Sequence, residues 1–265
     1  MNPEITVIIP TYNRASVLPR AVASVFGQTF SNFQLIVVDD GSVDGTQQYL
    51  ATLEDPRLKI LKTSNNGVSA ARNLAASKAC SEWLSFLDSD DEWLPDKLEK
   101  QLNLAKKSTN LSLIHGEEIW IRNGKRVNPM IKHKKKGGDV FLDSVRLCCI
   151  SPSTVMLKKK LFEKEGGFRE DFPVCEDYDL WLKITAKEEV GFVEEPIIVK
   201  YGGHKDQLSR KYVAMDYWRV IALEDILNKN LPAQQLVQAR FELINKAEIL
   251  LKGYLKHQNL VRYDS

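Results

Sequence analysis

Long hydrophobic runs are missing from the sequence, and none approaches the ~20 apolar residues that a helix needs to cross a bilayer. The N-terminus also lacks the basic and then apolar pattern of a secretory signal. Cysteine is scarce, and neither a disulfide framework nor a metal-ligand spacing connects Cys80, Cys148, Cys149 and Cys175. We therefore expect reduced cysteines in a soluble cytoplasmic protein, with peripheral contact at the inner face of the membrane as an alternative.

An excess of charge of either sign is also missing, because 37 Lys and Arg residues face 35 Asp and Glu residues. The net charge of +2 does not indicate a nucleic-acid-binding protein, so any electrostatic argument has to be local. The composition, 43% hydrophobic and 27% charged, is typical of a globular protein. At 265 residues the chain can form one large domain, or a domain with an appendage.

The first half of the chain alternates short, β-branched apolar runs with helical patterns. The apolar runs predict strands at residues 6–10, 35–40, 58–62 and 83–88. The stretches between and after them predict helices at about 15–28, 46–53, 67–78 and 95–107. Continuous apolar strands flanked by helices are typical of a parallel sheet covered on both faces, so we predict an α/β fold with a Rossmann-like, mostly parallel sheet.

Polar clusters follow every one of these predicted strands, at residues 10–14, 39–42, 64–69 and 88–91. The carboxyl ends of parallel strands share one edge of the sheet, where ligands bind in this class of fold. Surface polar residues without a function would fall at both edges equally. The convergence of the clusters therefore predicts one binding site at that edge.

The fourth cluster places Asp88, Asp90 and Asp91 directly after a buried strand. Two carboxylates separated by one residue suit Mg²⁺ or Mn²⁺, which takes one or two protein carboxylates and completes its shell with water and substrate phosphates. The alternative is that Asp88 and Asp91 cap the helix near Pro95 while Asp90 lies in solvent. The neighbouring clusters favour the metal interpretation.

The other strand ends offer contacts for a nucleotide. We favour a ligand contact for Asp39 and Asp40, because capping the next turn does not need both. Tyr12 presents either a stacking face for a base or a packing side chain. Gly67 lets the backbone approach a ligand, and Arg72 can pair with phosphate or with one of the aspartates.

A second acidic cluster, Glu176, Asp177 and Asp179, begins a helical pattern. Acidic residues in a first helical turn often only complement the helix dipole. The alternative is a general base that deprotonates the hydroxyl of an acceptor.

The remainder of the chain carries mixed patterns. They predict a hairpin turn at Asn123 and Gly124, a helix at 140–149, a strand at 153–158, and amphipathic helices at about 213–228 and 233–256. We expect the basic loop at 132–138 to be solvated, and the two last helices to pack on the core or in a homodimer. An anionic acceptor or a phospholipid surface is the alternative partner for both. One apolar face of the last helix contains Val237, Phe241, Ile244, Leu251 and Leu255.

Five motifs in this order resemble those of family 2 glycosyltransferases, which have the GT-A fold. They are VIIPTYNR, VVDDGSVDGT, NNGVSAARN, FLDSDDEWLPDKL and CEDYDLWLK. The resemblance covers about residues 4–210. It implies a catalytic domain at 1–210, with a nucleotide-sugar-binding half at 1–108 and an acceptor-binding half at 109–210, followed by a helical extension at 211–265.

The resemblance implies an inverting, metal-dependent transfer from a nucleoside diphosphate sugar, usually a UDP-sugar, to a saccharide or lipid-linked saccharide of a cell-surface polymer. Asp177 would be the catalytic base, and Asp90 would bind Mn²⁺ or Mg²⁺. His204, with Ser209, would close over the diphosphate and the metal, although a surface histidine is an alternative. The implied donor site contains Pro10, Thr11, Tyr12, Arg14, Asp39, Asp40, Gly67, Arg72, Asp88 and Ser89.

Other functions fit the sequence less well. A haloacid-dehalogenase-like phosphotransferase would need Thr or Val where this chain has Glu92, and no G-x-G-x-x-G follows the first strand as in a dehydrogenase. The Q-x-x-R-W motif of processive synthases is absent, so we expect one sugar to be added per encounter. A catalytically inactive sugar-nucleotide-binding module that acts through its helical tail is the remaining alternative.

Overall fold

The computed structural model of the chain describes residues 2–128, 130, 133–203 and 214–256. The first half contains strands β1 (Ile5–Thr11), β2 (Phe33–Asp39), β3 (Leu58–Lys62) and β4 (Trp83–Phe86), and helices α1 (Leu18–Phe26), α2 (Thr46–Ala51), α3 (Val68–Lys78) and α4 (Lys97–Lys107). The later strands are β5 (Glu92–Trp93), β6 (Leu113–Arg122), β7 (Lys125–Val127), β8 (Met156–Lys158) and β9 (Gly191–Gly202). The later helices are α5 (Phe141–Arg146), α6 (Lys159–Lys164), α7 (Glu176–Thr185), α9 (Asp216–Leu227) and α10 (Ala233–Lys256).

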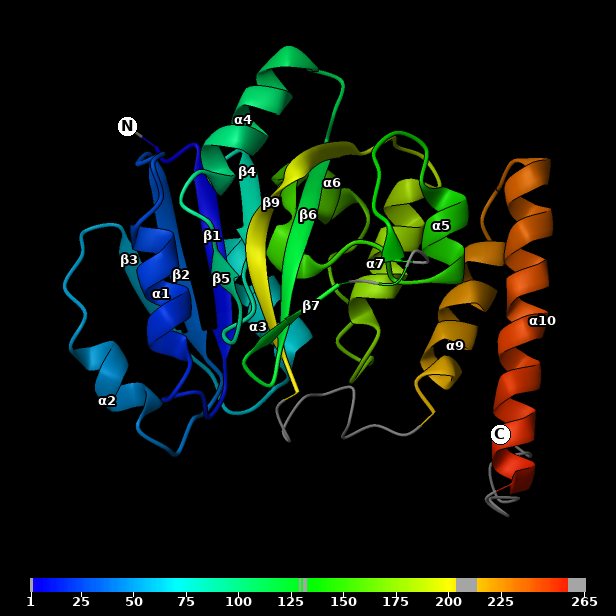
Figure 1. The fold of residues 1–265 in the computed structure, drawn as a ribbon, viewed down its shortest axis with the longest axis horizontal. Helices are drawn as coiled ribbons and strands as arrows, with labels where there is room; N and C mark the ends of the chain where they lie inside the picture. The colour runs from blue at the N-terminus through cyan, green and yellow to red at the C-terminus, as the bar shows by residue number, and fades with distance from the viewer. Residues whose placement is uncertain (1, 129, 131–132, 204–213, 257–265) are drawn as a thin grey trace.

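The strands form one sheet in the order β3-β2-β1-β4-β8-β6-β9-β5, with β7 paired to β6 (Figure 1). β1 is parallel to β2 and β4, and β2 is parallel to β3. β8 runs antiparallel to both β4 and β6, and so joins the parallel first half to the mixed second half. The predicted α/β fold with a mostly parallel sheet is confirmed.

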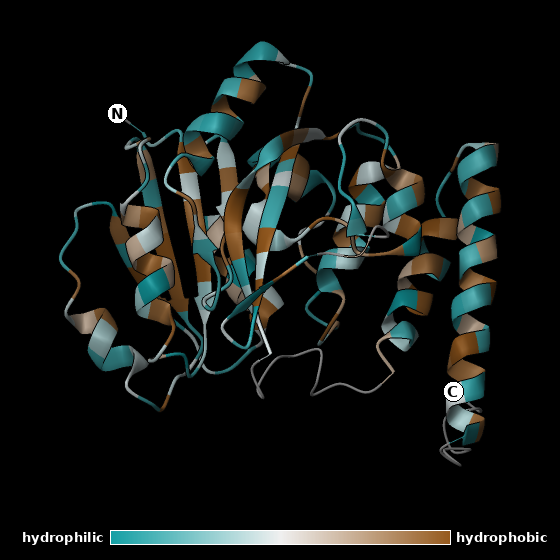
Figure 2. Cartoon of the chain, in the orientation of Figure 1, coloured by the Kyte–Doolittle hydropathy of each residue, from teal (hydrophilic) through white to brown (hydrophobic). Residues whose placement is uncertain are grey.

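Alternate residues of β1 face opposite sides of the sheet, and a helix covers each side. Val7 and Ile9 belong to the same core cluster as Val22 of α1. Ile8 lies in a second cluster with Ala75 of α3. The strand is buried on both faces, which explains why Val7, Ile8 and Ile9 are consecutive apolar residues and do not alternate with polar ones. Figure 2 shows that β1 and the strands beside it are largely hydrophobic.

Two predicted boundaries in the second half are wrong. The helix predicted at 140–149 ends at Arg146, because Leu147 has an extended backbone with φ −143° and ψ 149°. The following segment runs into the core, where Ile150 is fully buried. The strand predicted at 153–158 begins only at Met156, since residues 152–154 form a short 3₁₀ turn that starts with Pro152.

The last two helices pack beside α5 and α7 in a third core cluster (Figure 1). α10 contributes Ala239 and Leu243 to this cluster. Val237 and Phe241 of its predicted apolar face are 67% and 58% exposed, so within the described part of the chain this face does not pack on the core. The predicted domain boundary at residue 210 lies outside the described residues. Among the helices that the structure describes, none combines the length and the hydrophobicity that crossing a bilayer requires.

Candidate active site

A cleft of about 950 Å³ opens at the carboxyl ends of the parallel strands. It receives residues from the ends of β1, β2, β3 and β4, and from the beginning of α7. Its volume lies within the range of ~300–1,000 Å³ that is typical of small-molecule sites. The candidate residues that line it are Pro10, Thr11, Tyr12, Arg14, Asp40, Gly67, Arg72, Asp88, Ser89, Asp90 and Asp177.

Two candidate residues fall elsewhere. Asp39 does not line the cleft: it is fully buried, and its carboxylate accepts a hydrogen bond from the backbone N–H of Ser42, which fixes the turn after β2. His204 and its companion Ser209 lie outside the described residues, so their predicted contact with the diphosphate stays a prediction.

Asp40 organises the loop between β3 and α3. Its carboxylate accepts hydrogen bonds from the hydroxyl of Thr63 and from the backbone N–H groups of Asn66 and Gly67, at 2.6 to 2.8 Å. Gly67 has φ +94°, a conformation that favours glycine. Since a carboxylate has about four acceptor positions and protein groups use three, Asp40 holds the loop and can still accept one further donor.

Arg72 connects the two acidic clusters. Its guanidinium donates to Asp88 at 2.6 Å and to Glu176 at 2.7 Å, and it lies 4.9 Å from the ring centre of Phe168. Burial opposes its charge, but the carboxylates of Asp88 and Glu176 outweigh burial and raise the pKa of Arg72. Burial raises the pKa of Glu176 to about 7, against the attraction of Arg72. The sequence left open whether Arg72 pairs with phosphate or with an aspartate. In the structure its partners are the carboxylates of Asp88 and Glu176.

The three aspartates after β4 have different surroundings. Asp88 pairs with Arg72, whereas Asp91 is 2% exposed and accepts from the hydroxyl of Ser153 and the backbone N–H of Tyr201. Burial raises the pKa of Asp91 well above its usual range. Helix α4 begins only at Lys97, with Asp96 at its N-cap position, so the capping alternative is wrong for Asp88 and Asp91.

Asp90 is half-buried at the cleft, and its backbone carbonyl accepts from Arg20. Among the described residues, no cluster of three or more His, Cys, Asp and Glu side chains could by itself hold a metal ion. A single carboxylate at an open cleft nevertheless fits the way Mg²⁺ and Mn²⁺ bind, since these ions draw most of their ligands from water and substrate phosphates. The donor set is therefore compatible with a cation bound together with a diphosphate.

Asp177 occupies the first turn of α7 beside the cleft. The residue before this helix, Cys175, is in the left-handed region with φ 63°, which is uncommon for a residue other than glycine and often marks a functional site. The carboxylate of Asp177 accepts from the backbone N–H of Tyr178 at 2.7 Å and from the thiol of Cys148 at 3.2 Å. Asp179, in contrast, pairs with Lys183 and does not line the cleft.

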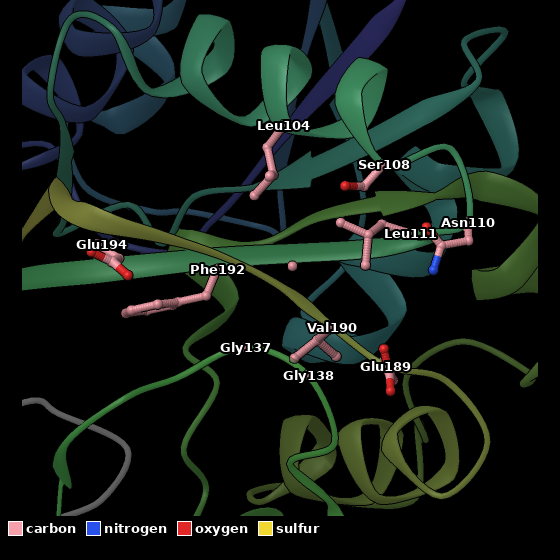
Figure 3. Close-up of a pocket in the computed structure, with 11 residues that line it drawn as sticks. Leu104, Ser108, Asn110, Leu111, Gly137, Gly138, Glu189, Val190, Phe192 and Glu194 are labelled. Atoms are coloured by element: carbon pink, nitrogen blue, oxygen red, sulfur yellow. The ribbon is translucent and has the colours of Figure 1, made fainter.

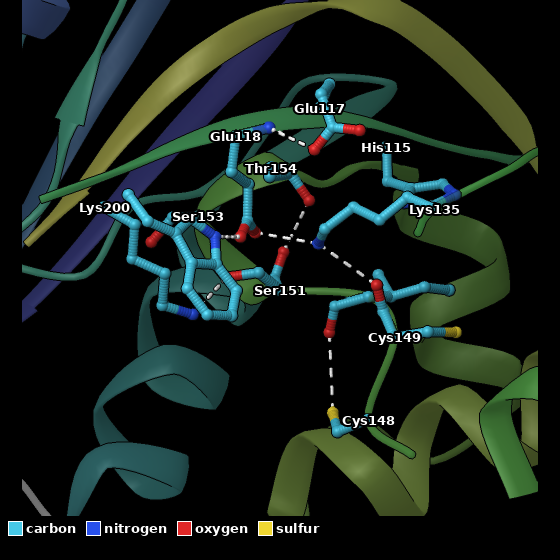
Figure 4. A network of polar contacts seen from close by, with 12 residues as sticks. His115, Glu117, Glu118, Lys135, Cys148, Cys149, Ser151, Ser153, Thr154 and Lys200 are labelled. Atoms are coloured by element: carbon cyan, nitrogen blue, oxygen red, sulfur yellow. Dashed lines mark hydrogen bonds and ion pairs between the residues drawn. The ribbon is translucent and has the colours of Figure 1, made fainter. Parts of the chain in front are cut away.

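Figure 4 shows a polar network that the sequence did not reveal, which includes Lys200, Ser151, Glu118 and Lys135. Lys200 of β9 lines the cleft and donates to the hydroxyl of Ser151 at 2.9 Å. Burial opposes its charge, but Glu118, Asp91, Asp88 and Asp177 raise the pKa of Lys200. Lys135 is 8% exposed and pairs with Glu118 at 2.8 Å, so the expectation of a solvated basic loop is wrong at this position.

A second, shallower hollow of about 360 Å³ contains none of the candidate residues (Figure 3). It is lined by the end of α4, the glycines at 137 and 138, and the segment that leads into β9.

All four cysteines are free, as predicted.

Comparison with known proteins identifies the family. The family model described as "Glycosyl transferase family 2" matches residues 6–166 of the chain. UDP-Glc:alpha-D-GlcNAc-diphosphoundecaprenol beta-1,3-glucosyltransferase WfgD of Escherichia coli is 32% identical over 190 residues, which are 71% of this chain and 72% of that protein. An uncharacterized glycosyltransferase of Rickettsia conorii is 34% identical over 195 residues, or 73% of this chain, which spans about a third (32%) of that relative.

Solved structures agree on the fold. S. aureus TarS 1-349 in complex with UDP-GlcNAc superimposes with a TM-score of 0.78 at 23% identity, over 93% of this chain and 72% of that one. At this identity the likeness speaks for the fold alone. The family match, which covers more than half of the sequence, shows that the chain belongs to glycosyl transferase family 2.

Proposed function

We propose that the protein transfers one sugar, with inversion, from a nucleoside diphosphate sugar to a hydroxyl group of a saccharide or lipid-linked saccharide in cell-surface polysaccharide synthesis. The observation that carries this proposal is the single cleft that unites four strand ends with the carboxylate of Asp177. A UDP-sugar is the donor we favour, because WfgD is named for UDP-Glc and the TarS structure holds UDP-GlcNAc. The name of WfgD also includes a diphosphoundecaprenol acceptor, which supports a lipid-linked substrate.

In the proposed donor site, Pro10, Tyr12 and Asp40 hold the base. Tyr12 is 42% exposed at the cleft, so its ring is accessible for stacking. Asp40 accepts from the nucleotide at the position that protein donors leave available. Asp39 contributes by fixing the turn after β2, and Asp88, oriented by Arg72, lies near the ribose.

In the proposed reaction, Asp177 takes the proton of the acceptor hydroxyl while that oxygen attacks the sugar from the face opposite the diphosphate. Its two hydrogen bonds hold the carboxylate in one orientation. Displacement with inversion is a single in-line step, so the site needs no covalent nucleophile.

We propose that Asp90 holds Mn²⁺ or Mg²⁺ together with the donor diphosphate, and that His204 closes over the same group. The bound cation would neutralise the charge that develops on the leaving diphosphate. Lys200 adds a positive charge on the cleft side of β9, close enough to Asp91 and Asp177 for these carboxylates to raise its pKa.

The remaining partner proposals concern the C-terminal helices. We propose a catalytic domain up to residue 210 and a helical extension after it. We also propose that the protein forms a homodimer through the exposed apolar face of α10. Membrane contact, where it occurs, is peripheral. The exposed large apolar side chains of α10 are Val237, Phe241, Ile244, Ile249, Leu251 and Leu255.

The test is the release of UDP from a panel of UDP-sugars, with and without acceptor, in Mn²⁺ and in EDTA. We expect turnover that needs the metal, that is lost in Asp90→Ala, and that falls in Asp177→Asn while donor binding is retained. Asp96→Ala is the matched control, because Asp96 is a partly exposed aspartate outside the cleft. Tight donor binding without any turnover would instead favour an inactive binding module, and no binding of any nucleotide sugar would refute the proposal.

A further inference from the structure

The proposed base has a neighbour that no sequence motif includes. The Sγ atom of Cys148 lies 3.2 Å from Oδ2 of Asp177, and the two residues are 29 positions apart in the chain. Sγ also lies 3.5 Å from the carbonyl oxygen of Ile150. A thiol has one proton to donate, and a carboxylate is a stronger acceptor than a neutral carbonyl group. The hydrogen bond to Asp177 is therefore the dominant one.

The local fold explains how Cys148 reaches this position. Helix α5 ends at Arg146, and Leu147 turns the chain into an extended segment. Ile150 is fully buried, which anchors that segment against the core. Continuation of the helix would have carried Cys148 onto another path, so the early end of α5 is what places the thiol beside α7.

We propose that Cys148 is a positioning residue for the glycosyl transfer, and that its thiol holds Oδ2 of Asp177 so that this carboxylate is oriented when the acceptor hydroxyl arrives. The kinetic consequence of this inference rests on the proposed function, whereas the contact between Cys148 and Asp177 does not. The backbone N–H of Tyr178 holds the other oxygen, so donors fix both carboxylate oxygens.

The electrostatic surroundings keep the thiol protonated. Burial, followed by the charge of Asp177 and the hydrogen bond to it, raises the pKa of Cys148 well above its usual range. The charged or titratable groups that face Asp177 are Cys148 from the segment after α5, Cys175 and Glu176 from the start of α7, and Lys200 from β9. A protonated thiol is a hydrogen-bond donor and a poor nucleophile, so its role here is to donate.

The adjacent Cys149 provides a matched comparison. Its Sγ lies 3.4 Å from the hydroxyl of Ser144 and makes no contact with Asp177. Figure 4 shows the two side chains pointing in different directions. Cys148→Ala and Cys149→Ala each remove one thiol, at adjacent positions. Only Cys148→Ala removes a hydrogen bond to the proposed base.

The first test does not depend on enzymatic activity. The S–H stretching band of Cys148 is isolated as the infrared difference between the wild-type protein and Cys148→Ala. We expect this band to move to higher frequency in Asp177→Asn, because a neutral amide accepts more weakly than a carboxylate. It should not move in Asp179→Asn, whose carboxylate pairs with Lys183. A Cys148 band at the same frequency in Asp177→Asn would overturn the proposed contact.

The second test measures kcat and KM for the acceptor. The thiol contacts the proposed base and not the substrate, so we expect Cys148→Ala to lower kcat by about three- to tenfold, which corresponds to one lost hydrogen bond, with little change in KM. Cys148→Ser, which retains a donor, should restore the wild-type kcat, and Cys149→Ala should leave kcat unchanged.

The outcomes separate the two proposals. An unchanged kcat in Cys148→Ala, or an equal loss of kcat in Cys148→Ala and Cys148→Ser, refutes the positioning role. If the wild-type protein transfers no sugar, the proposed function fails, while the infrared experiment still decides whether the thiol holds the carboxylate.

Discussion

Replacement of Arg72 by methionine should destabilise the protein strongly, and in a pH-dependent way. The guanidinium is 3% exposed and donates to two carboxylates, Asp88 and Glu176, at 2.6 and 2.7 Å. Methionine keeps most of the apolar volume over Phe168 but removes the charge, so both carboxylates lose their buried partner. Removal of one member of a buried ion pair costs about 3–5 kcal/mol, which we expect for Arg72→Met at pH 8.

Urea unfolding measures this loss. For a slope of about 2 kcal/mol per M, the midpoint should fall by about 1.5–2.5 M. Arg57→Met is the matched control, because Arg57 also forms a 2.9 Å ion pair, with Asp55, but its side chain is 29% exposed. A surface pair of this kind contributes about 0–1 kcal/mol.

The pH dependence follows from Glu176. Its pKa is 4.5 as an unperturbed group and about 7 in the folded protein, so protonation stabilises the folded state, and that stabilisation is lost as the pH rises towards 7. Without Arg72 the folded pKa rises further, because an attractive charge is gone. The deficit of Arg72→Met should therefore be largest at pH 8 and shrink near pH 5, where Glu176 is protonated. A deficit equal to that of Arg57→Met, or one that is the same at both pH values, would refute this reasoning.

Two further predictions concern binding. Tyr12→Ala should raise the KM for the donor by about 5- to 150-fold, since stacking of a base on an aromatic ring contributes about 1–3 kcal/mol, whereas Tyr12→Phe should be close to wild type in the same steady-state assay. Phe241→Glu should shift the protein from dimer to monomer in sedimentation equilibrium, because it puts a charge into the exposed apolar face of α10, and Lys256→Glu on the same helix should not. A wild-type protein that is monomeric at every concentration tested would contradict the dimer.

The first half of the fold could be predicted because its signals are local. β1 is buried on both faces, so its sequence from Val7 to Ile9 is apolar without alternation, and the helices between the strands leave their own periodic patterns. In a parallel sheet the carboxyl ends of all strands share one edge. Clusters far apart in the sequence could therefore be assigned to one cleft before any coordinates were known.

The second half could not be predicted to the same depth, because its contacts join distant segments. Lys135 belongs to a run of basic residues, and nothing local indicates that it pairs with Glu118, 17 positions away, in a buried network. Lys200 lies in a strand whose sequence carries no motif, yet Asp88 and Asp91, more than 100 positions earlier, act on its charge. The contact of Cys148 depends on α5 ending before its helical pattern does.

The three aspartates after β4 show how one motif can contain residues with different tasks. Like charges so close together repel, and burial strengthens the repulsion, so each needs its own surroundings. Asp88 receives a guanidinium, and Asp91 receives a hydroxyl and a backbone N–H from β9 while Lys200 lowers the cost of its charge. Asp91 thus connects the strand end to the second half of the sheet, whereas Asp90 lines the cleft. We therefore expect a substitution at Asp90 to affect the proposed chemistry of the site. A substitution at Asp91 should affect the contact between the two halves of the sheet.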